Sequence, residues 1–288
     1  MRNTALLTVL ALVGCGTSEQ GGDETTAPRE APAALPAAAM PQPTDADSLA
    51  ALTPSPREVI AAMKAAGLTV AISDLVPDRE LSTAGMSNNL AAVWTGVLAA
   101  DAILTGADSG QDEFVQRLKA VESGMGQLGA GAGLMATLTD AITRVENGTA
   151  SREDFLREFE EVLAMKVPGE GWGPEDDSGI LVQAGSWLAG VNLVSKAIVV
   201  AQKEGAAQVL LRHGSVVDHF LHYVRVEGPD SAPKSGLETL NQSLLEMGVI
   251  TRKTELLTLA DAERIHALTE AVFASLVGEV PTEPSSGE

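Results

Sequence analysis

Two long stretches that are apolar on nearly every side constrain the fold of this chain most. They cover residues 85–105 and 179–203. A helix that is apolar all round either lies buried at the centre of a fold or crosses a membrane. Asp101 in the first stretch, and Asn192 and Lys196 in the second, oppose a membrane span, as does the lack of basic flanking residues. We therefore expect two central core helices.

Shorter amphipathic segments with clear start signals accompany these two stretches. Ser55-Pro56-Arg57-Glu58 has the form of a capping box with a proline in the first turn. Ser151 and Thr258 each precede an acidic residue by three positions, which also favours a helix start. Strand-like alternation of β-branched and aromatic residues is hard to find. The sequence predicts an all-α fold, a helical bundle of about eight to nine helices.

The order of segments suggests an internal duplication within a helical domain of residues 53–278. Trp94 and Trp187 lie in the two apolar stretches, 93 residues apart, each followed by Ala-Ile. We hypothesise two similar four-helix halves, residues 83–166 and 178–278. After each core helix we expect, for the two halves in turn, a partner helix (111–128; 205–224), a shorter helix (133–147; 235–246) and a closing helix (151–165; 258–277).

The N-terminus indicates an exported protein. Residues 1–14 begin with one basic residue and continue with an apolar run, the order of a secretory signal peptide. The run is too short to cross ~30 Å of hydrocarbon as a helix. It ends at Leu12-Val13-Gly14-Cys15, and Cys15 is the only cysteine. This ending resembles the lipobox of bacterial lipoproteins, and the resemblance implies cleavage before Cys15, a diacylglycerol on its sulfur and an acylated amino terminus.

A lipid on Cys15 would place the protein in a bacterial cell envelope. One acyl chain binds a membrane only marginally, whereas two or more anchor a protein stably. Gly16, rather than an aspartate, after the cysteine favours the outer membrane by analogy with enteric bacteria, with the folded part facing the periplasm or the exterior. The alternative is an ordinary secreted protein whose signal peptide contains a cysteine.

The segments on either side of the helical domain have the composition of disordered chain. Residues 16–52 contain five prolines among Ala, Gly, Thr and Glu and show no apolar period. Proline fixes φ and lacks a backbone donor, so we expect residues 15–52 to be a lipidated cysteine and a disordered tether. Fully extended, this tether reaches roughly 115 Å. Residues 279–288 are expected to form a disordered tail.

The charge of the chain excludes some partners. The formal net charge is −20 at pH 7. Nucleic-acid phosphates and anionic lipid headgroups both attract Lys and Arg, so we expect no nucleic-acid binding and no electrostatic adhesion to a membrane. Membrane attachment would then rest on the lipid, and the acidic helical surface would be open to a protein partner in the envelope.

Two sequence motifs carry a second resemblance. The motifs are Pro54-Ser55-Pro56 before the first helix and Gly185-Ser186-Trp187-Leu188-Ala189-Gly190, with Gly96 in the earlier apolar stretch. They resemble an uncharacterised family of all-helical bacterial lipoproteins, in which an acidic residue usually stands at the position of Ala189. The resemblance spans about residues 54–200, and it implies a helical fold and an envelope location without an activity.

A cluster of polar residues near position 218 is a candidate metal site. His219 and His222 are three residues apart, and Asp218 precedes His222 by four, so the three share one side of a helix. With a fourth ligand they could bind zinc. Valines and Phe220 centre on the opposite side, which favours the alternative of ordinary solvated side chains. His213 falls with the apolar residues, so we expect a hydrogen-bonded histidine at the core edge.

Trp94 and Trp187 are candidate ligand-binding residues, because pockets often form between the core helices of a bundle. Core packing alone is the alternative explanation for both. No nucleophile, histidine and acid stand in a recognisable catalytic pattern, and no sequence motif indicates a cofactor.

Three hypotheses for function follow from the sequence. The first is a membrane-anchored envelope lipoprotein with a non-catalytic binding or assembly role. The second is a carrier that holds a small apolar ligand between the core helices, near Trp94 and Trp187. The third is a metal-dependent enzyme that uses His219 and His222. A filled core favours the first, and a closed apolar cavity of ~300 Å³ or more favours the second.

Overall fold

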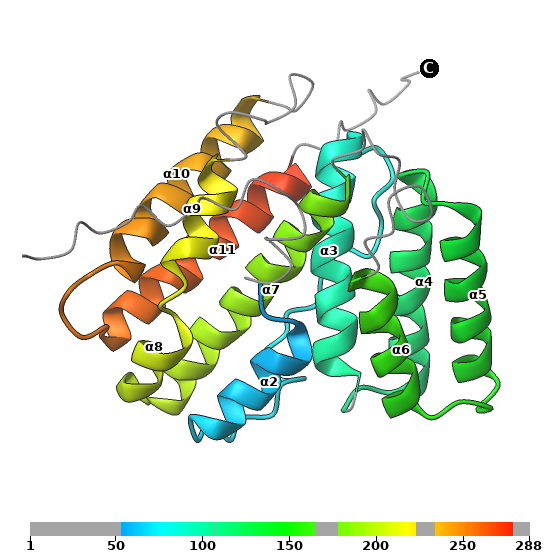
Figure 1. Ribbon diagram of the computed structural model, residues 1–288, viewed down its shortest axis with the longest axis horizontal. Helices are drawn as coiled ribbons and strands as arrows, with labels where there is room; N and C mark the ends of the chain where they lie inside the picture. Colours follow the sequence, from blue (N-terminus) through cyan, green and yellow to red (C-terminus); the bar gives the residue numbers. More distant parts are fainter. Residues whose placement is uncertain (1–52, 107, 165–177, 223–233, 279–288) are drawn as a thin grey trace, which may run out of the picture. The chain divides into compact units, whose positions relative to one another are not determined.

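The described part of the chain is entirely helical. The computed structural model describes residues 53–106, 108–164, 178–222 and 234–278, and these ranges contain ten α-helices and no strand (Figure 1). They all belong to one compact unit, Gln42–Glu288. The all-α fold is therefore confirmed. The expected signal peptide, Cys15, the tether to residue 52 and the tail from residue 279 lie outside the described residues.

The helices follow the expected segments closely, with one exception. In chain order they are α2 (Pro56–Ala65), α3 (Asn88–Thr105), α4 (Gln111–Gln127), α5 (Ala132–Glu146), α6 (Arg152–Ala164), α7 (Ser178–Ala201), α8 (Glu204–Leu210), α9 (Gly214–His222), α10 (Lys234–Thr251) and α11 (Leu259–Gly278). The capping signals account for two of the starts. Ser55 and Glu58 exchange hydrogen bonds as a capping box at α2. Thr258 and Asp261 do the same at the start of α11.

The single helix expected over residues 205–224 is instead two helices, α8 and α9. The chain leaves the α-helical path at Leu211, and the amide of His213 donates to the Leu211 carbonyl. The guanidinium group of Arg212 fixes this break from outside, because it donates to the backbone carbonyls of Lys253 and Glu255. The break between α8 and α9 could not be predicted from helical periodicity within the segment, because these partners lie about 40 residues further along the chain.

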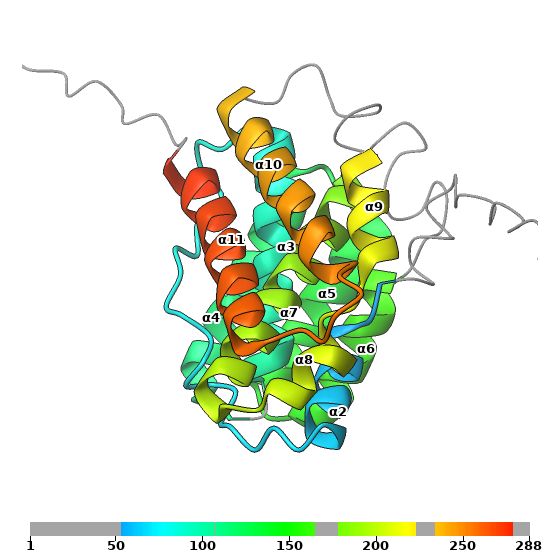
Figure 2. The same cartoon turned by 90° about the vertical axis from the view of Figure 1, so that its left-hand side faces the viewer.

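The two apolar helices cross at the centre of the unit. α3 packs against α7 and α4, and α11 packs along α7 (Figures 1 and 2). From α3 the chain continues through α4, α5 and α6, each packed on the one before. From α7 it continues through α8 and α9 to α10, and α11 then returns to contact α10, α8 and α7. Sixteen of the 18 residues of α3 are buried, as expected of a core helix.

α7 is long and apolar enough to cross a membrane by length and composition alone. However, 72% of its most apolar 18-residue window is buried inside the folded unit. That is the environment of a core helix, which is what the polar residues Asn192 and Lys196 in this helix predict.

Two glycines set the distance between α3 and α7. A Cβ atom on Gly96 would overlap the Val182 carbonyl, and a Cβ atom on Gly185 would overlap the Val93 carbonyl. The crossing is reciprocal, since Gly96 and Gly185, like Val93 and Val182, are 89 residues apart. Trp94 and Trp187 are 93 residues apart and are therefore not equivalent positions at this crossing. The duplication itself stays a hypothesis.

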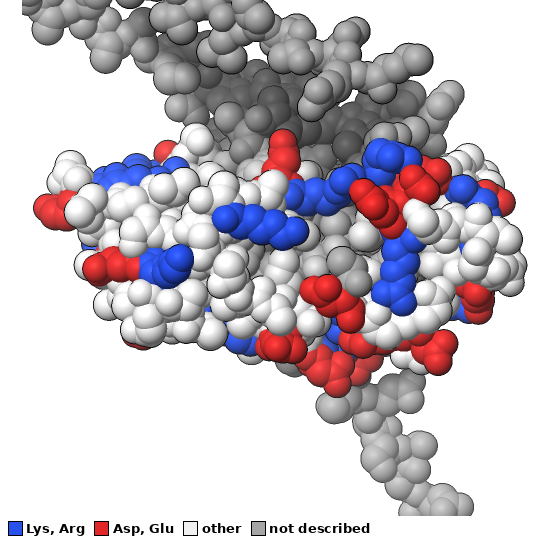
Figure 3. Space-filling model, turned by 90° about the horizontal axis from the view of Figure 1, so that it is seen from below, with Lys and Arg blue, Asp and Glu red and all other residues white. Residues whose placement is uncertain are grey.

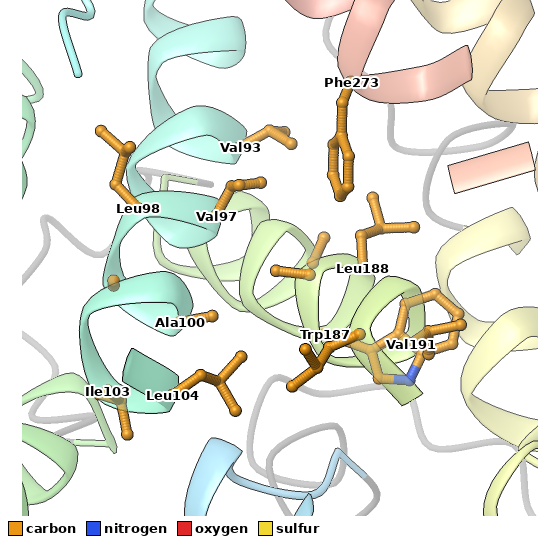
Figure 4. Packing of buried hydrophobic residues seen from close by; sticks show 14 of the residues in the cluster. Val93, Val97, Leu98, Ala100, Ile103, Leu104, Trp187, Leu188, Val191 and Phe273 are labelled. Atoms are coloured by element: carbon orange, nitrogen blue, oxygen red, sulfur yellow. The ribbon is translucent and has the colours of Figure 1, made fainter. Parts of the chain in front are cut away.

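Side chains from three helices fill the space around the crossing. Figure 4 shows Val93 and Val97 of α3 directed toward α7, and Phe273 of α11 reaching toward both helices. Trp94 is 2% exposed and packs edge-on against Phe273, with ring centres 6.3 Å apart. Because no disulfide can form within the chain, this packing is the main source of stability.

Candidate functional site

Two groups of polar atoms stand out in the buried part of the molecule. The first lies where the segment between α2 and α3, residues 68–87, runs against the core helices; we call this segment the strap. Arg79 Nε of the strap donates to Asp101 Oδ2 of α3 at 2.8 Å. The Arg79 guanidinium also lies over the Phe273 ring of α11, 4.3 Å from its centre.

Further hydrogen bonds hold the strap, to Gln127 of α4 through Thr83 and Met86 and to both crossing helices. Lys196 Nζ of α7 donates to the Leu75 carbonyl at 2.7 Å, and Trp94 Nε1 of α3 donates to the Glu80 carbonyl at 2.9 Å. The strap thus has a polar contact to each of the two crossing helices and a cation–π contact to α11. This explains how a segment without regular secondary structure can lie over an apolar core.

Asp101 and Arg79 form a buried ion pair, with side chains 6% and 7% exposed. Burial raises the pKa of the Asp101 carboxyl to about 6, and the positive charge of Arg79 only partly opposes this effect. The loss of hydration therefore outweighs the attraction between the two charges, as is common for buried pairs. Near pH 7 the carboxylate is still ionised and accepts the Arg79 hydrogen bond.

The buried side-chain amide of Asn192 connects α7 to α11. Asn192 Nδ2 lies 2.9 Å from Thr269 Oγ1, 2.7 Å from Glu270 Oε1 and 3.0 Å from His266 Nδ1. Partial burial lowers the pKa of His266, against the opposing charge of Glu270. The neutral ring can then accept from Asn192. The Asn192 amide has two N–H groups for these three contacts, and they fix α11 against α7.

The second group lies at a recess between α2, α7 and the turn from α8 to α9. Its walls are apolar apart from Ser186 and His213. The lining residues are Pro54, Pro56, Val59, Ser186, Trp187, Gly190, Val191, Val194, Leu210 and His213. The centre of a water molecule can occupy about 20 Å³ of the recess, and all the space between its lining atoms, adjoining solvent included, is about 340 Å³.

The Trp187 indole N–H is a buried donor without an acceptor. The side chain of Trp187 is 4% exposed, and no atom of the described residues accepts from its Nε1. Its ring packs against Phe220 of α9 at 5.2 Å. In Figure 4 the ring leaves α7 on the side away from the labelled α3 residues. An unpaired buried N–H is costly, so Trp187 differs from Trp94, whose N–H is bonded.

His213 lies at the edge of the core, as expected. Burial lowers the pKa of its imidazole, and a hydrogen bond to the Leu210 backbone only partly opposes this. The ring is therefore neutral near pH 7. Since no Lys, Arg, Asp or Glu lines the recess, the recess is uncharged at that pH.

The two tryptophans predicted as ligand residues do not share a site. Trp187 lines the recess, whereas Trp94 packs on Phe273 and bonds the strap. The two motifs that resembled a lipoprotein family do meet, because the Pro54–Pro56 stretch and the Ser186–Gly190 stretch both line the recess.

The predicted metal ligands have other surroundings. Asp218 forms an ion pair with Arg252, the residue after α10, and His219 packs edge-on against Phe220 with ring centres 5.8 Å apart. The His222 side chain lies outside the described residues. Among the side chains that are described, no three of His, Cys, Asp or Glu come together as metal ligands would. The zinc hypothesis therefore gains no support from geometry.

The sequence analysis did not predict the buried polar contacts of α3 and α7 with the strap and with α11, although some of the residues involved could have been recognised. Asp101, Asn192 and Lys196 are polar residues in otherwise apolar helices, and a buried polar residue requires a partner. That requirement could have marked all three as members of a network. Their partners, Arg79 and His266, gave no local signal, because they come from segments 22 and 74 residues away.

Comparison of the chain with models of protein families, with curated protein sequences and with solved structures gave no significant match.

Proposed function

We propose that this chain is a lipid-anchored protein of a bacterial envelope whose helical domain has a non-catalytic binding or assembly role. The observation that carries the proposal is the N-terminal sequence. This sequence has a basic start, a short apolar run and Leu-Val-Gly before the only cysteine. It resembles the signal peptide and lipobox of a bacterial lipoprotein. A proline-bearing segment follows it. Each buried lipid methylene contributes ~0.8 kcal/mol to membrane binding.

The packing of the domain supports binding at a surface over enclosure of a ligand. The volume of the recess that the centre of a water molecule can occupy, about 20 Å³, is far below the ~300 Å³ or more of pockets that enclose whole small molecules. The ionisable residues of the buried cluster pair with one another and hold the strap. Neither feature favours a carrier with an internal cavity.

The surface charge supports a protein partner over a charged lipid surface. On the face shown in Figure 3, acidic and basic side chains are interspersed among uncharged residues, without a continuous basic patch. Ion pairs such as Lys119–Glu146 and Arg264–Glu246 occupy part of the charged surface. A surface of this kind suits a specific protein contact better than adhesion to anionic headgroups.

The test of the anchor is a pair of variants expressed in a bacterial host fed with labelled palmitate. Cys15→Ser removes the lipid acceptor, and Ser18→Ala changes a nearby polar residue as the matched control. The proposal expects the label and membrane fractionation in the control and in the unchanged protein, and neither in Cys15→Ser. A Cys15→Ser protein that still carries label and still fractionates with membranes would refute the anchor.

The binding role is tested with the lipidated protein in its own envelope. A photo-crosslinking residue at exposed Val249 or Val209 should give a discrete crosslinked species of fixed mass. The same residue at buried Val97 is the negative control. Crosslinking spread over many masses at the exposed positions would contradict a specific partner.

A further inference from the structure

We propose that the surface of α3, α4, α7 and α11 beneath the strap is a groove for an extended peptide. The strap of the same chain fills this groove, and a segment of a protein partner can take its place. The partner segment carries an arginine followed two residues later by an aliphatic side chain. This inference rests on the binding role proposed above and names the chemistry of the partner. It does not involve the lipid on Cys15.

The central part of the strap has the conformation of a bound extended peptide. Residues 77–83 form neither a helix nor a turn, and exposed and shielded side chains alternate along them. The exposed side chains are those of Asp78, Glu80 and Ser82. Between them, the side chain of Arg79 is 7% exposed, Leu81 packs against the core and Thr83 is buried. Alternate residues of an extended chain lie on opposite sides, so one side of the strap faces the helices.

The helices hold the strap largely by its backbone. Lys196 of α7 donates to the Leu75 carbonyl, and Trp94 of α3 donates to the Glu80 carbonyl. Gln127 of α4 contacts the strap further along the chain. Every peptide carries backbone carbonyls, so such contacts tolerate other sequences. In the recognition of extended peptides, main-chain hydrogen bonds supply affinity and side-chain pockets supply specificity.

Asp101 and Phe273 form the pocket that gives this groove its specificity. The Arg79 guanidinium donates to the Asp101 carboxylate at 2.8 Å and lies 4.3 Å from the centre of the Phe273 ring. A planar guanidinium combines both contacts, and an ammonium group does not replace it at such a site. The Asp101 side chain is 6% exposed, so a carboxylate left without a cation here is costly. An occupant of the groove must therefore supply an arginine.

A glycine with positive φ lies at each end of the strap. Gly67 precedes it with φ of 72°, and Gly85 lies near its end with φ of 82°. Glycine adopts this region without the steric cost that other residues have. The two ends are therefore points at which the backbone can rotate, so the strap can leave the groove while α2 and α3 stay helical.

A partner segment competes with the strap, which has a high effective concentration because it belongs to the same chain. The apparent affinity of the groove for an outside peptide is lowered by the fraction of time that the strap occupies it. Arg79→Met weakens the strap and leaves the Asp101 pocket intact. A peptide that brings its own arginine should therefore bind the Arg79→Met chain better than the unchanged chain.

The experiment measures binding to the full chain by fluorescence anisotropy. The probe is a fluorescein-labelled synthetic peptide with the sequence of residues 68–87. We expect the Arg79→Met chain to bind this peptide about tenfold more tightly than the unchanged chain does, or better. A peptide that itself carries Arg79→Met should bind the Arg79→Met chain about tenfold more weakly. A peptide that carries Asp78→Asn, at an outward-facing position, is the matched control and should bind within about twofold of the probe.

A second substitution in the chain assigns the contact. Asp101→Asn, added to the Arg79→Met chain, removes the carboxylate that the arginine of the peptide would meet. The probe and its Arg79→Met version should then bind within about twofold of each other. Arg79→Lys keeps a cation and is the milder chain variant, in which the probe should still bind more tightly than to the unchanged chain. Thermal unfolding establishes that each variant is folded.

Three results would overturn the groove: no binding of the probe to either Arg79 variant of the chain, equal binding of the probe and its Arg79→Met version to the Arg79→Met chain, or equal binding of the probe to the unchanged and variant chains. A dimer of the unchanged chain that the probe dissociates would assign the groove to a second copy and overturn a separate partner. The crosslinking at Val249 and Val209 tests the binding role itself, so the two failures are distinguishable.

Discussion

Gly96 of α3 and Gly190 of α7 have different surroundings. Gly96 touches the backbone of α7, whereas Gly190 faces Val59 with room for a methyl group. The same substitution therefore has opposite expected effects at the two positions. The comparison separates close backbone approach from general helix propensity, because both glycines are buried residues in the interior of long helices.

We predict that Gly96→Ala destabilises the domain by about 1–3 kcal/mol or more, because the added methyl forces α3 and α7 apart. Gly190→Ala should stabilise it by about 0.5–1 kcal/mol through the lower backbone entropy of alanine in the unfolded chain. Urea unfolding of the two variants measures both values. Equal effects would show that the backbones of α3 and α7 are not in close contact at Gly96.

Asp101 gives the domain a pH-dependent stability of defined sign. Its pKa is about 6 in the folded protein and 3.8 as a free side chain, so the folded state binds this proton more tightly. The carboxylate therefore costs stability above pH 6, and that cost disappears as the pH falls from 6 to 4. The shift of about two units corresponds to roughly 3 kcal/mol.

We predict that, relative to Asp101→Asn, the unchanged protein gains up to roughly 3 kcal/mol of stability between pH 7 and pH 4. Asparagine does not titrate, and His213 and His266, whose pKa values are lowered, titrate in both proteins and cancel in the difference. Urea unfolding at several pH values measures the difference. Parallel curves for the two proteins would contradict a raised pKa at Asp101.

At the scale of elements, the strap depends on the side chain of Arg79. Arg79 is the residue that joins it to both α3 and α11, through Asp101 and Phe273. Removal of one partner of a buried ion pair leaves the other charge unpaired in the interior, which typically costs about 3–5 kcal/mol.

We predict that Arg79→Met lowers the free energy of unfolding by about 3–5 kcal/mol and speeds amide hydrogen exchange across residues 68–87. Lys119→Met removes the cation of an exposed pair with Glu146, whose side chains are 51% and 49% exposed, and should change little. Hydrogen exchange with mass spectrometry measures exchange separately in residues 68–87 and in the segments around Lys119 and Glu146. If exchange in the strap is unchanged in Arg79→Met, then the ion pair does not hold it.

Most elements could be predicted from the sequence because their signals are local. The capping boxes at Ser55 and Thr258 predict helix starts, and the apolar composition of residues 85–105 and 179–203 on every side predicts the core helices. The break between α8 and α9 could not be predicted, because carbonyls near residue 254 hold Arg212 there. The recess combines both cases: Trp187 was a candidate, but its neighbours Pro56 and Leu210 meet it only through the tertiary fold.

At the scale of the whole molecule, the proposed lipid on Cys15 would anchor a packed helical domain. The domain is held together by the burial of apolar side chains around α3 and α7. Polar residues hold the strap and cap the helix ends. Its attachment to a membrane would depend on Cys15 alone, since the net charge of −20 repels the chain from anionic headgroups.

The most direct test of the central claim is the intact mass and N-terminal sequence of the protein isolated from bacterial membranes. We predict a chain that begins at Cys15, with a diacylglycerol on the sulfur and a fatty acid on the amino terminus. A chain that begins at Met1 with a free thiol on Cys15 would contradict the account.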